Sequence, residues 1–223
     1  MARKIIKESY LRTMIREAIN EKLNEAKMDG FSFDTLSGKS FREKARYCQE
    51  MCGRQIGGGS SRIVFQIDDQ WVLKLARNQK GIAQNKEEFK IATDMYGSQL
   101  SVKVDEGCSD TEGYEWIVSE YVLPAKAQDF RQVYGIDWND VVYFAQALEH
   151  DQRSIDGLYE KYSGNEDATD LLNDIHEYWS NWNGTLGDVE RLCNWGMARR
   201  DGYIQMVLLD LGGSADIISK YYR

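Results

Sequence analysis

One lysine stands in an otherwise apolar run, Val72-Leu73-Lys74-Leu75-Ala76, whose composition predicts a β-strand. A buried ammonium group is costly unless an anion meets it, so Lys74 needs a carboxylate or a phosphate as its partner. Fourteen residues further on, Glu88 lies on the same face of the next predicted helix as Ala92 and Met95. We therefore expect Glu88 to hold Lys74 and to direct its ammonium group at a phosphate.

A glycine-rich segment precedes this strand. Gly57, Gly58 and Gly59 are followed by Ser60 and Ser61. Residues without a Cβ atom let backbone amides approach phosphate oxygens closely. Three glycines alone are equally well explained by a flexible turn, but together with the strand lysine they favour a site that binds phosphate groups.

A second set of polar residues lies in the C-terminal half, at Asp188, Asn194 and Asp210. Carboxylate and amide oxygens are the ligands that magnesium prefers, and a carboxylate can also orient an attacking hydroxyl group. Taken singly, each of these residues would rather be a helix cap or a turn residue.

The elements that must position these residues follow from hydrophobic periodicity, which predicts an α+β chain with strands first and helices second. Residues 1–39 are expected to form an amphipathic helix and a linker, 40–123 a β-rich N-lobe, and 124–223 a reduced, mainly helical C-lobe. A capping box at Ser40 and Glu43 predicts that a helix begins there. The predicted strands are 62–67, 71–76, 100–106, 114–122, 195–198 and 204–209, and the later helices are 81–96, 138–148, 155–162 and 168–182.

The N-terminal residues carry a separate signal. Apolar residues recur at helical spacing from Ile5 to Ala26 among Lys, Arg and Glu, and the stretch 27–39 has no periodicity, as in a linker or loosely held arm. Such a charged amphipathic leader resembles the N-termini of many tailed-bacteriophage proteins. It would equally suit any helix that docks on a protein partner or assembly, or that mediates oligomerisation.

Composition excludes several classes of protein. With 28 Lys and Arg against 36 Asp and Glu, the 223-residue chain carries a net charge of -8, the wrong sign for holding a nucleic acid by charge. The sequence lacks an apolar run that could span a membrane and the apolar centre of a secretory signal. We therefore expect an intracellular protein, in the host cytoplasm or associated with the virion if it is phage-encoded. The scattered cysteines, expected to be reduced, are Cys48, Cys52, Cys108 and Cys193.

The order of the polar motifs resembles the protein-kinase-like fold, including small-molecule kinases of the aminoglycoside phosphotransferase type. The glycine-rich loop, Lys74, Glu88 and the run 116–122 look like the phosphate loop, strand lysine, helix glutamate and interlobe hinge of that family. The resemblance implies ATP and Mg2+ as cofactors, with adenine held by the backbone of Glu120 and Val122. Segments 186–196 and 207–212 resemble the catalytic loop and the metal-binding Asp-Phe-Gly turn. This resemblance implies that Asn194 and Asp210 bind the metal and that Asp188 orients the attacking hydroxyl group.

The sequence also departs from the family pattern. Arg62 replaces the third glycine of the loop, Leu186 stands where His is usual, and Glu190 stands where a basic residue often neutralises the transferring phosphate. The catalytic-loop aspartate and asparagine are one step further apart than usual, and only thirteen residues follow Asp210. Three functions therefore stay open. The first is an active phosphotransferase acting on a protein Ser/Thr or small-molecule hydroxyl. The second is a pseudokinase that serves as a binding or structural module. The third is a globular domain whose role is to present the N-terminal helix.

Overall fold

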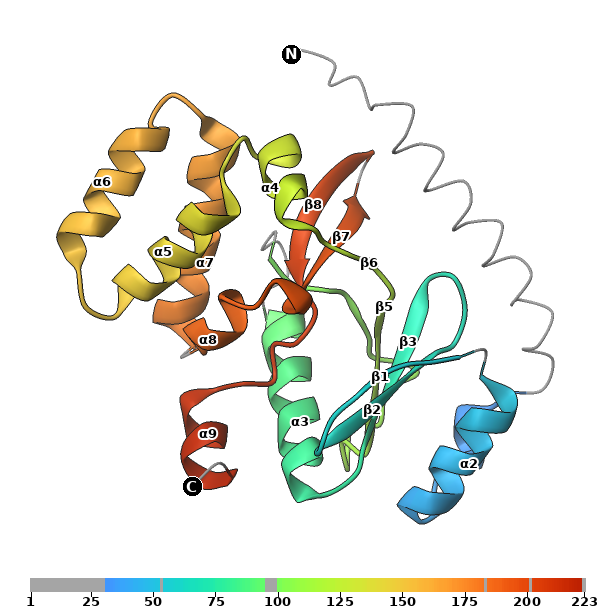
Figure 1. Ribbon diagram of the computed structural model, residues 1–223. Coiled ribbons are helices and arrows are strands. Elements are labelled where there is room, and N and C mark those ends of the chain that lie inside the picture. Colours follow the sequence, from blue (N-terminus) through green and yellow to red (C-terminus); the bar gives the residue numbers. More distant parts are fainter. Residues whose placement is uncertain (1–30, 53, 95–99, 183, 201, 222–223) are drawn as a thin grey trace.

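The computed structural model describes residues 31–52, 54–94, 100–182, 184–200 and 202–221. The chain has the expected α+β architecture, with a β-sheet N-lobe and a mainly helical C-terminal region (Figure 1). The predicted N-terminal amphipathic helix lies outside the described residues. Within them, no helix is long and apolar enough to cross a membrane.

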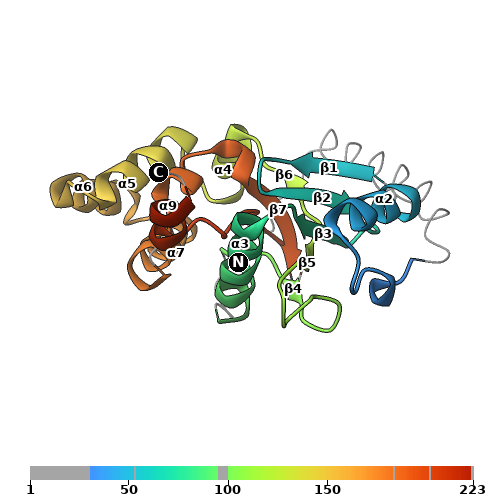
Figure 2. The ribbon, with the colours of Figure 1, turned by 90° about the horizontal axis from the view of Figure 1, so that it is seen from below.

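The N-lobe is built on a five-stranded sheet in the order β1-β2-β3-β5-β4, in which all neighbouring strands are antiparallel. Helix α3 contacts β3, β5 and the C-terminal helix, and lies between the sheet and the C-lobe (Figures 1 and 2). The elements of this lobe are a 3-10 turn at Phe33–Thr35, α2 at Phe41–Met51, β1 at Arg54–Gly58, β2 at Arg62–Gln66, β3 at Trp71–Ala76, α3 at Gln79–Asp94, β4 at Val104–Asp105 and β5 at Trp116–Glu120.

Helix α2 begins where the capping box predicts. The Glu43 carboxylate accepts hydrogen bonds from the Ser40 amide at 2.9 Å and from its hydroxyl at 2.6 Å. The described part of the preceding stretch, 31–39, is more firmly held than the sequence suggests. Leu36 is fully buried in the core beneath α2, and the Phe31 ring stacks on Tyr47. The expectation of a loosely held arm is therefore wrong for these residues, because their few apolar side chains find a hydrophobic surface that periodicity cannot reveal.

The two faces of the N-lobe sheet have different partners, and this difference positions the polar residues. Leu73 and Leu75 of β3 join Ile63 and Phe65 of β2 in a core cluster with α2. Because successive side chains of a strand alternate between faces, Lys74 must point to the other side, where α3 lies. An ammonium group is thereby placed inside the molecule by the same alternation that builds the core.

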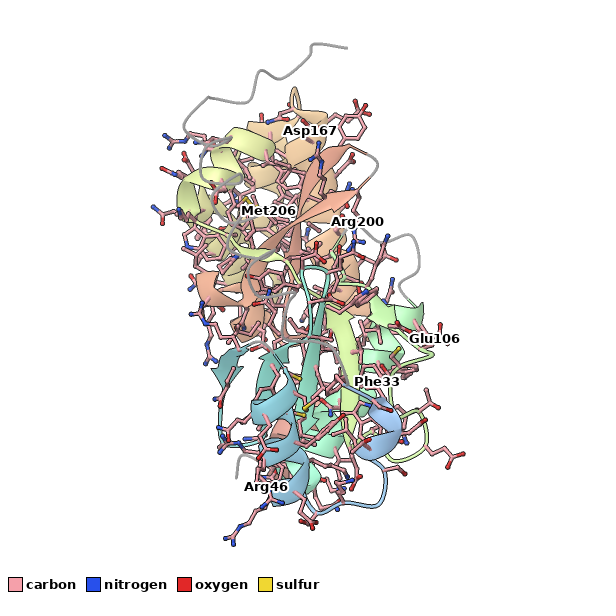
Figure 3. All side chains as sticks on the ribbon, turned by 90° about the vertical axis from the view of Figure 1, so that its right-hand side faces the viewer. Phe33, Arg46, Glu106, Asp167, Arg200 and Met206 are labelled. Atoms are coloured by element: carbon pink, nitrogen blue, oxygen red, sulfur yellow. The ribbon has the colours of Figure 1, made fainter. Side chains whose placement is uncertain are left out.

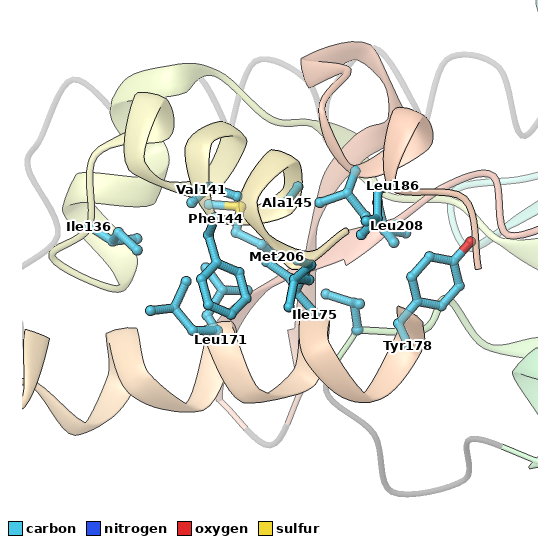
Figure 4. Close-up of a cluster of buried hydrophobic side chains, with 14 of the residues drawn as sticks. Ile136, Val141, Phe144, Ala145, Leu171, Ile175, Tyr178, Leu186, Met206 and Leu208 are labelled. Atoms are coloured by element: carbon cyan, nitrogen blue, oxygen red, sulfur yellow. The ribbon is translucent and has the colours of Figure 1, made fainter. Parts of the chain in front are cut away.

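The C-lobe combines a helical bundle with a small antiparallel sheet in the order β6-β7-β8. Figure 4 shows Phe144 of α5 and Leu171 and Ile175 of α7 packed together in its core. Its elements are β6 at Leu123–Pro124, α4 at Ala127–Val133, α5 at Trp138–Leu148, α6 at Gln152–Tyr162, α7 at Glu166–Trp182, α8 at Leu186–Val189, a second 3-10 turn at Leu192–Asn194, β7 at Trp195–Arg200, β8 at Tyr203–Leu208 and α9 at Ala215–Tyr221.

Five short elements were not predicted from the sequence: β1, β6, α4, α8 and α9. Pro124 pairs with Gly196 as part of the edge strand β6, a position where a missing N–H is tolerated. The predicted strand 100–106 shortens to β4, although Ser101 forms an isolated parallel bridge with Leu208.

The two lobes are also joined through the segment of residues 100–103. The Leu208 amide of β8 donates to the Leu100 carbonyl at 2.8 Å. Arg200, at the end of β7, donates to the Ser101 carbonyl at 2.9 Å and forms a 2.6 Å ion pair with Glu120 of β5 (Figure 3). Segment 100–103 therefore lies between the two sheets and is hydrogen-bonded to both.

Candidate functional site

Lys74 of β3 and Glu88 of α3 form the ion pair that the sequence predicts. The Glu88 side chain is fully buried, and that of Lys74 is 8% exposed. The Lys74 ammonium also donates to the Leu209 carbonyl at 2.5 Å. Because Leu209 immediately precedes Asp210, the N-lobe lysine and the C-lobe aspartate are brought to the same place.

Arg62 is a site residue whose role the sequence did not reveal. Its guanidinium donates to Glu88 Oε2 at 2.7 Å and to Asp210 Oδ1 at 2.6 Å, with a further bond to Asn85 Oδ1 at 3.2 Å. Strand register explains this position. Val64 pairs with Lys74, so Arg62, two residues earlier on β2, lies on the same face of the sheet as the lysine.

Asn85 is the second site residue that was missed. It is fully buried on the face of α3 that also carries Glu88, one turn away. Its amide nitrogen donates to the Tyr114 carbonyl at 2.9 Å and to the Lys74 carbonyl at 3.3 Å. Asn85 thus fixes α3 to the strand that carries the lysine, while its oxygen receives Arg62.

On the C-lobe side, the β7–β8 hairpin brings two distant residues together. Asn194 directly precedes β7 and Asp210 lies two residues beyond β8, while Trp195 pairs with Leu208 at this end of the hairpin. The Leu209 amide donates to the Asn194 carbonyl at 2.7 Å. The two residues expected to bind metal are therefore neighbours, as antiparallel pairing requires.

Asp188 lies on the short helix α8 and is held by three neighbours. Thr185 Oγ donates to its Oδ2 at 2.7 Å, and the Asn194 amide donates to its Oδ1 at 3.3 Å. Gly213 passes so close that a Cβ atom there would lie 2.2 Å from Asp188 Oδ2. Burial raises the pKa of Asp188, against the opposing effect of the Thr185 hydrogen bond, and the Asp210 charge raises it further. The carboxylate is thus fixed in orientation and made more basic.

The pKa of Asp210 is shifted in the opposite direction. Burial would raise its pKa, but Arg62 and then Lys74 outweigh that effect and hold the pKa below its usual value. Its side chain keeps 41% exposure although one carboxylate oxygen bonds Arg62 and the Gly212 amide. The two aspartates of the site are therefore separated in basicity, with Asp210 the weaker base and Asp188 the stronger one.

The glycine-rich segment is only partly a turn. Gly57 and Gly58 belong to β1 and pair with Val64 and Ile63, so the turn to β2 is made by residues 59–61. Ser60 and Ser61 are anchored through their carbonyls, which accept bonds from the Asn78 side chain at 3.0 Å and from the Arg77 amide at 2.7 Å. This tip is therefore tied to the connection between β3 and α3.

Glu120 and Val122, expected to hold adenine, lie at the connection between the lobes. The Glu120 amide already donates to the Lys103 carbonyl at 2.8 Å, so its remaining backbone group toward a ligand is the carbonyl oxygen. The Val122 side chain is buried in a small cluster with Val102, Ala198 and Val207. Both residues thus occupy a rigid part of the junction.

The departures from the family pattern have structural explanations. Leu186 is buried in the C-lobe core, where a leucine adds packing. The extra step between Asp188 and Asn194 is taken up by the 3-10 turn at Leu192–Asn194. Glu190 accepts a hydrogen bond from Gln146 of α5 at 3.0 Å.

Asp210 and Asn194 offer the type of ligand atom that Mg2+ prefers. Asp210 is a charged carboxylate and Asn194 supplies an amide oxygen, both hard oxygen ligands. Among the described residues no group of three or more His, Cys, Asp or Glu side chains could hold a metal alone. A cation here would need oxygens from a phosphate or from water for its remaining positions, which is the usual way in which Mg2+ is bound beside phosphates.

A cavity of about 330 Å³ lies elsewhere, between α2 and the start of α3. Its walls include Phe41, Ile82 and the ion-paired Lys44 and Glu115. None of the predicted site residues lines it, so it is separate from the charged cluster.

Comparisons with known proteins give a likeness at the level of fold. No known family profile matches the sequence, and no curated protein matches it. Among solved structures, the GDP and kanamycin complex of APH(2")-IIia is 11% identical with a TM-score of 0.35, over 71% of this chain and 66% of that one. The gentamicin complex of APH(2")-IIa is 12% identical with a TM-score of 0.33, over 80% and 73% of the two chains. The ADP-bound aminoglycoside phosphotransferase APH(2'')-Ib is 12% identical with a TM-score of 0.32, over 79% and 72%. The chain spans about two thirds of the length of the first of these proteins.

Proposed function

We propose that this chain is a kinase-like, ATP-binding phosphotransferase that moves a phosphoryl group to a hydroxyl acceptor with the help of Mg2+. One observation carries the proposal. The buried pair of Lys74 and Glu88 meets the Leu209 carbonyl, and so places a fixed cation beside Asp210 at the junction of the lobes. A buried lysine fixed in this way is suited to holding phosphate oxygens.

Each residue has a role that follows from its surroundings. Lys74, held by Glu88, binds the phosphates, and the tip offers the backbone amides of Ser60 and Ser61, since that of Gly59 already donates to the Arg62 carbonyl at 2.8 Å. The backbone of Glu120 and Val122 is the proposed contact for adenine. Asn194 and Asp210 would hold Mg2+, which when bound supplies neutralisation of the phosphate charge.

Asp188 is the proposed base. Its orientation is fixed by Thr185 and Asn194, and its pKa is raised, so it can accept the proton of an acceptor hydroxyl more readily than an ordinary aspartate. We propose a small-molecule hydroxyl or a protein Ser/Thr as the acceptor. Proton transfer to Asp188 would increase the nucleophilicity of the oxygen as it attacks the phosphoryl group.

The test is a comparison of binding with turnover. Affinity for a non-hydrolysable ATP analogue is measured by calorimetry with and without Mg2+, and release of ADP is followed with a panel of hydroxyl compounds. We expect Asp188→Ala to lower turnover by about 10²-fold or more while nucleotide affinity changes by less than about threefold. Asp156→Ala, at an exposed position on α6, is the matched control and should behave as wild type. Equal turnover in Asp188→Ala and wild type would refute the proposal.

A second candidate is a pseudokinase that binds nucleotide and acts as a structural module. The observation that favours it is the 2.6 Å ion pair between Arg62 and Asp210, which occupies one oxygen of the proposed metal ligand. Tight, Mg2+-dependent nucleotide binding without turnover that depends on Asp188 would support this alternative. Turnover lost in both Asp188→Ala and Asp210→Asn would exclude it.

A docking role for the N-terminal residues belongs to either alternative. We propose that the predicted helix of residues 5–26 binds a protein partner, which would be a phage assembly if the chain is phage-encoded. Deleting residues 1–30 should leave folding and nucleotide affinity unchanged and should abolish a partner or oligomer contact. Unfolding of the body on deletion would instead mean that this segment belongs to its core.

A further inference from the structure

Four charged side chains of the site form a group whose formal charges cancel, beside Asp188. Two cations, Lys74 and Arg62, face two carboxylates, Glu88 and Asp210, and three ion pairs join them. The side chains of both cations are only 8% exposed, so the cluster is poorly screened by water. Bringing a divalent cation to Asp210 would add two positive charges to a cluster whose formal charges cancel.

We infer that Arg62 is a resident cation that competes with the divalent metal for Asp210. The inference rests on the proposed function in taking Asp210 as a metal ligand. Arg62 NH2 lies 2.6 Å from Asp210 Oδ1, which is a full charge-assisted hydrogen bond. A metal that binds Oδ1 must displace the guanidinium, and one that binds the other carboxylate oxygen meets its positive charge. Arg62 is a positioning residue here, since it acts on the metal through the carboxylate.

The Arg62 guanidinium keeps two other hydrogen-bond partners when it leaves Asp210. Its other nitrogen is held by Glu88 at 2.7 Å and by Asn85 at 3.2 Å, both fully buried. Release of Asp210 therefore breaks one of its ion pairs and keeps the other. Arriving phosphates would favour the exchange, because they bring negative charge that the freed guanidinium can meet.

The experiment measures metal binding without nucleotide, using Mn2+ as the probe and electron paramagnetic resonance to count free ions. We expect Arg62→Gln to bind Mn2+ at least about tenfold more tightly than wild type, because it removes the competing charge and leaves the cluster with a net negative charge. Arg62→Lys should show a smaller gain in Mn2+ affinity, because a lysine ammonium cannot bridge Glu88 and Asp210 as the planar guanidinium does. Arg54→Gln, at an exposed position of β1, is the matched control and should not change the affinity.

Circular dichroism and thermal unfolding establish whether each variant is folded. If Arg62→Gln is not folded, the Mn2+ affinity of Arg62→Lys is the test. Adding Asp210→Asn to Arg62→Gln should abolish the gain. Unchanged or weaker Mn2+ binding in the folded Arg62 variant, or a gain that survives Asp210→Asn, overturns the inference. Because no nucleotide is present, this failure is distinguishable from that of the proposed function, which is judged by ATP affinity and turnover in the wild type.

Discussion

Replacing Glu88 with glutamine should strongly destabilise the protein. Glu88 is fully buried and is the shared partner of Lys74 and Arg62, each only 8% exposed at its side chain. Breaking a buried pair by removing one member costs about 3–5 kcal/mol, because the remaining charge stays out of water. Arg62 keeps Asp210 and Lys74 keeps the Leu209 carbonyl. We therefore take the lower end, about 3 kcal/mol.

This free energy converts into a measurable shift in Tm. At about 2.1 cal/mol/K per residue, unfolding the 223-residue chain carries an entropy of about 0.5 kcal/mol/K, so Tm should fall by about 6 °C. Differential scanning calorimetry at neutral pH measures the shift, with urea unfolding as a second measure of the loss in free energy. Glu87→Gln, a half-exposed neighbour on α3, is the control and should change Tm by less than about 2 °C.

A double-mutant cycle tests the cause. Lys74→Met alone should also destabilise, but adding it to Glu88→Gln should cost less than the sum of the two single effects, with an interaction energy of about 1–3 kcal/mol. If Glu88→Gln unfolds within about 2 °C of wild type, or if the two effects simply add, the two side chains do not form the buried pair described above.

Three other substitutions probe separate parts of the site and the C-lobe. Gly213→Ala would place a Cβ atom 2.2 Å from Asp188 Oδ2, so turnover should fall at least about tenfold at unchanged nucleotide affinity. Gly81→Ala would place a Cβ atom 2.1 Å from the Ser61 carbonyl oxygen, so calorimetry should show nucleotide affinity reduced by about tenfold as the tip moves. Burial, with neighbouring carboxylates adding to it, raises the pKa of Asp174 to about 6. The stability that this shift contributes is present below about pH 4 and is lost as the pH rises through 6, so Asp174→Asn should stabilise the protein by about 1 kcal/mol at pH 7.5 and by less at pH 4.5.

Much of the site could be predicted because it depends on local rules. Strand alternation forces Lys74 away from the core that Leu73 and Leu75 form, and helical periodicity gives α3 one face for Glu88. The closeness of Asn194 to the segment that carries Asp210 follows from the hairpin of β7 and β8, both of which were predicted as strands. Such features need no knowledge of the tertiary structure.

The parts that could not be predicted depend on contacts between distant segments. Arg62 was noticed only as a missing glycine, although its register with Lys74 places it on the same face. Its choice of Asp210, 148 residues away, needs the C-lobe to be in place. Asn85 had no signal except its spacing of three residues from Glu88. Strand β6 has only two residues, too few for a periodic pattern, and β1 has no alternation of apolar residues because Ile56 is followed by two glycines. Both form because a neighbouring strand pairs with them.

The hydrogen bonds made by segment 100–103 limit how the lobes can move. Leu208, Arg200 and Glu120 fasten this segment to both sheets. Separation of the lobes by translation would break all of these bonds at once, whereas rotation about an axis through the segment keeps them. The lobes would then open by rotation while they stay joined at segment 100–103, and the Leu208 amide should exchange its hydrogen as slowly as the core strands do.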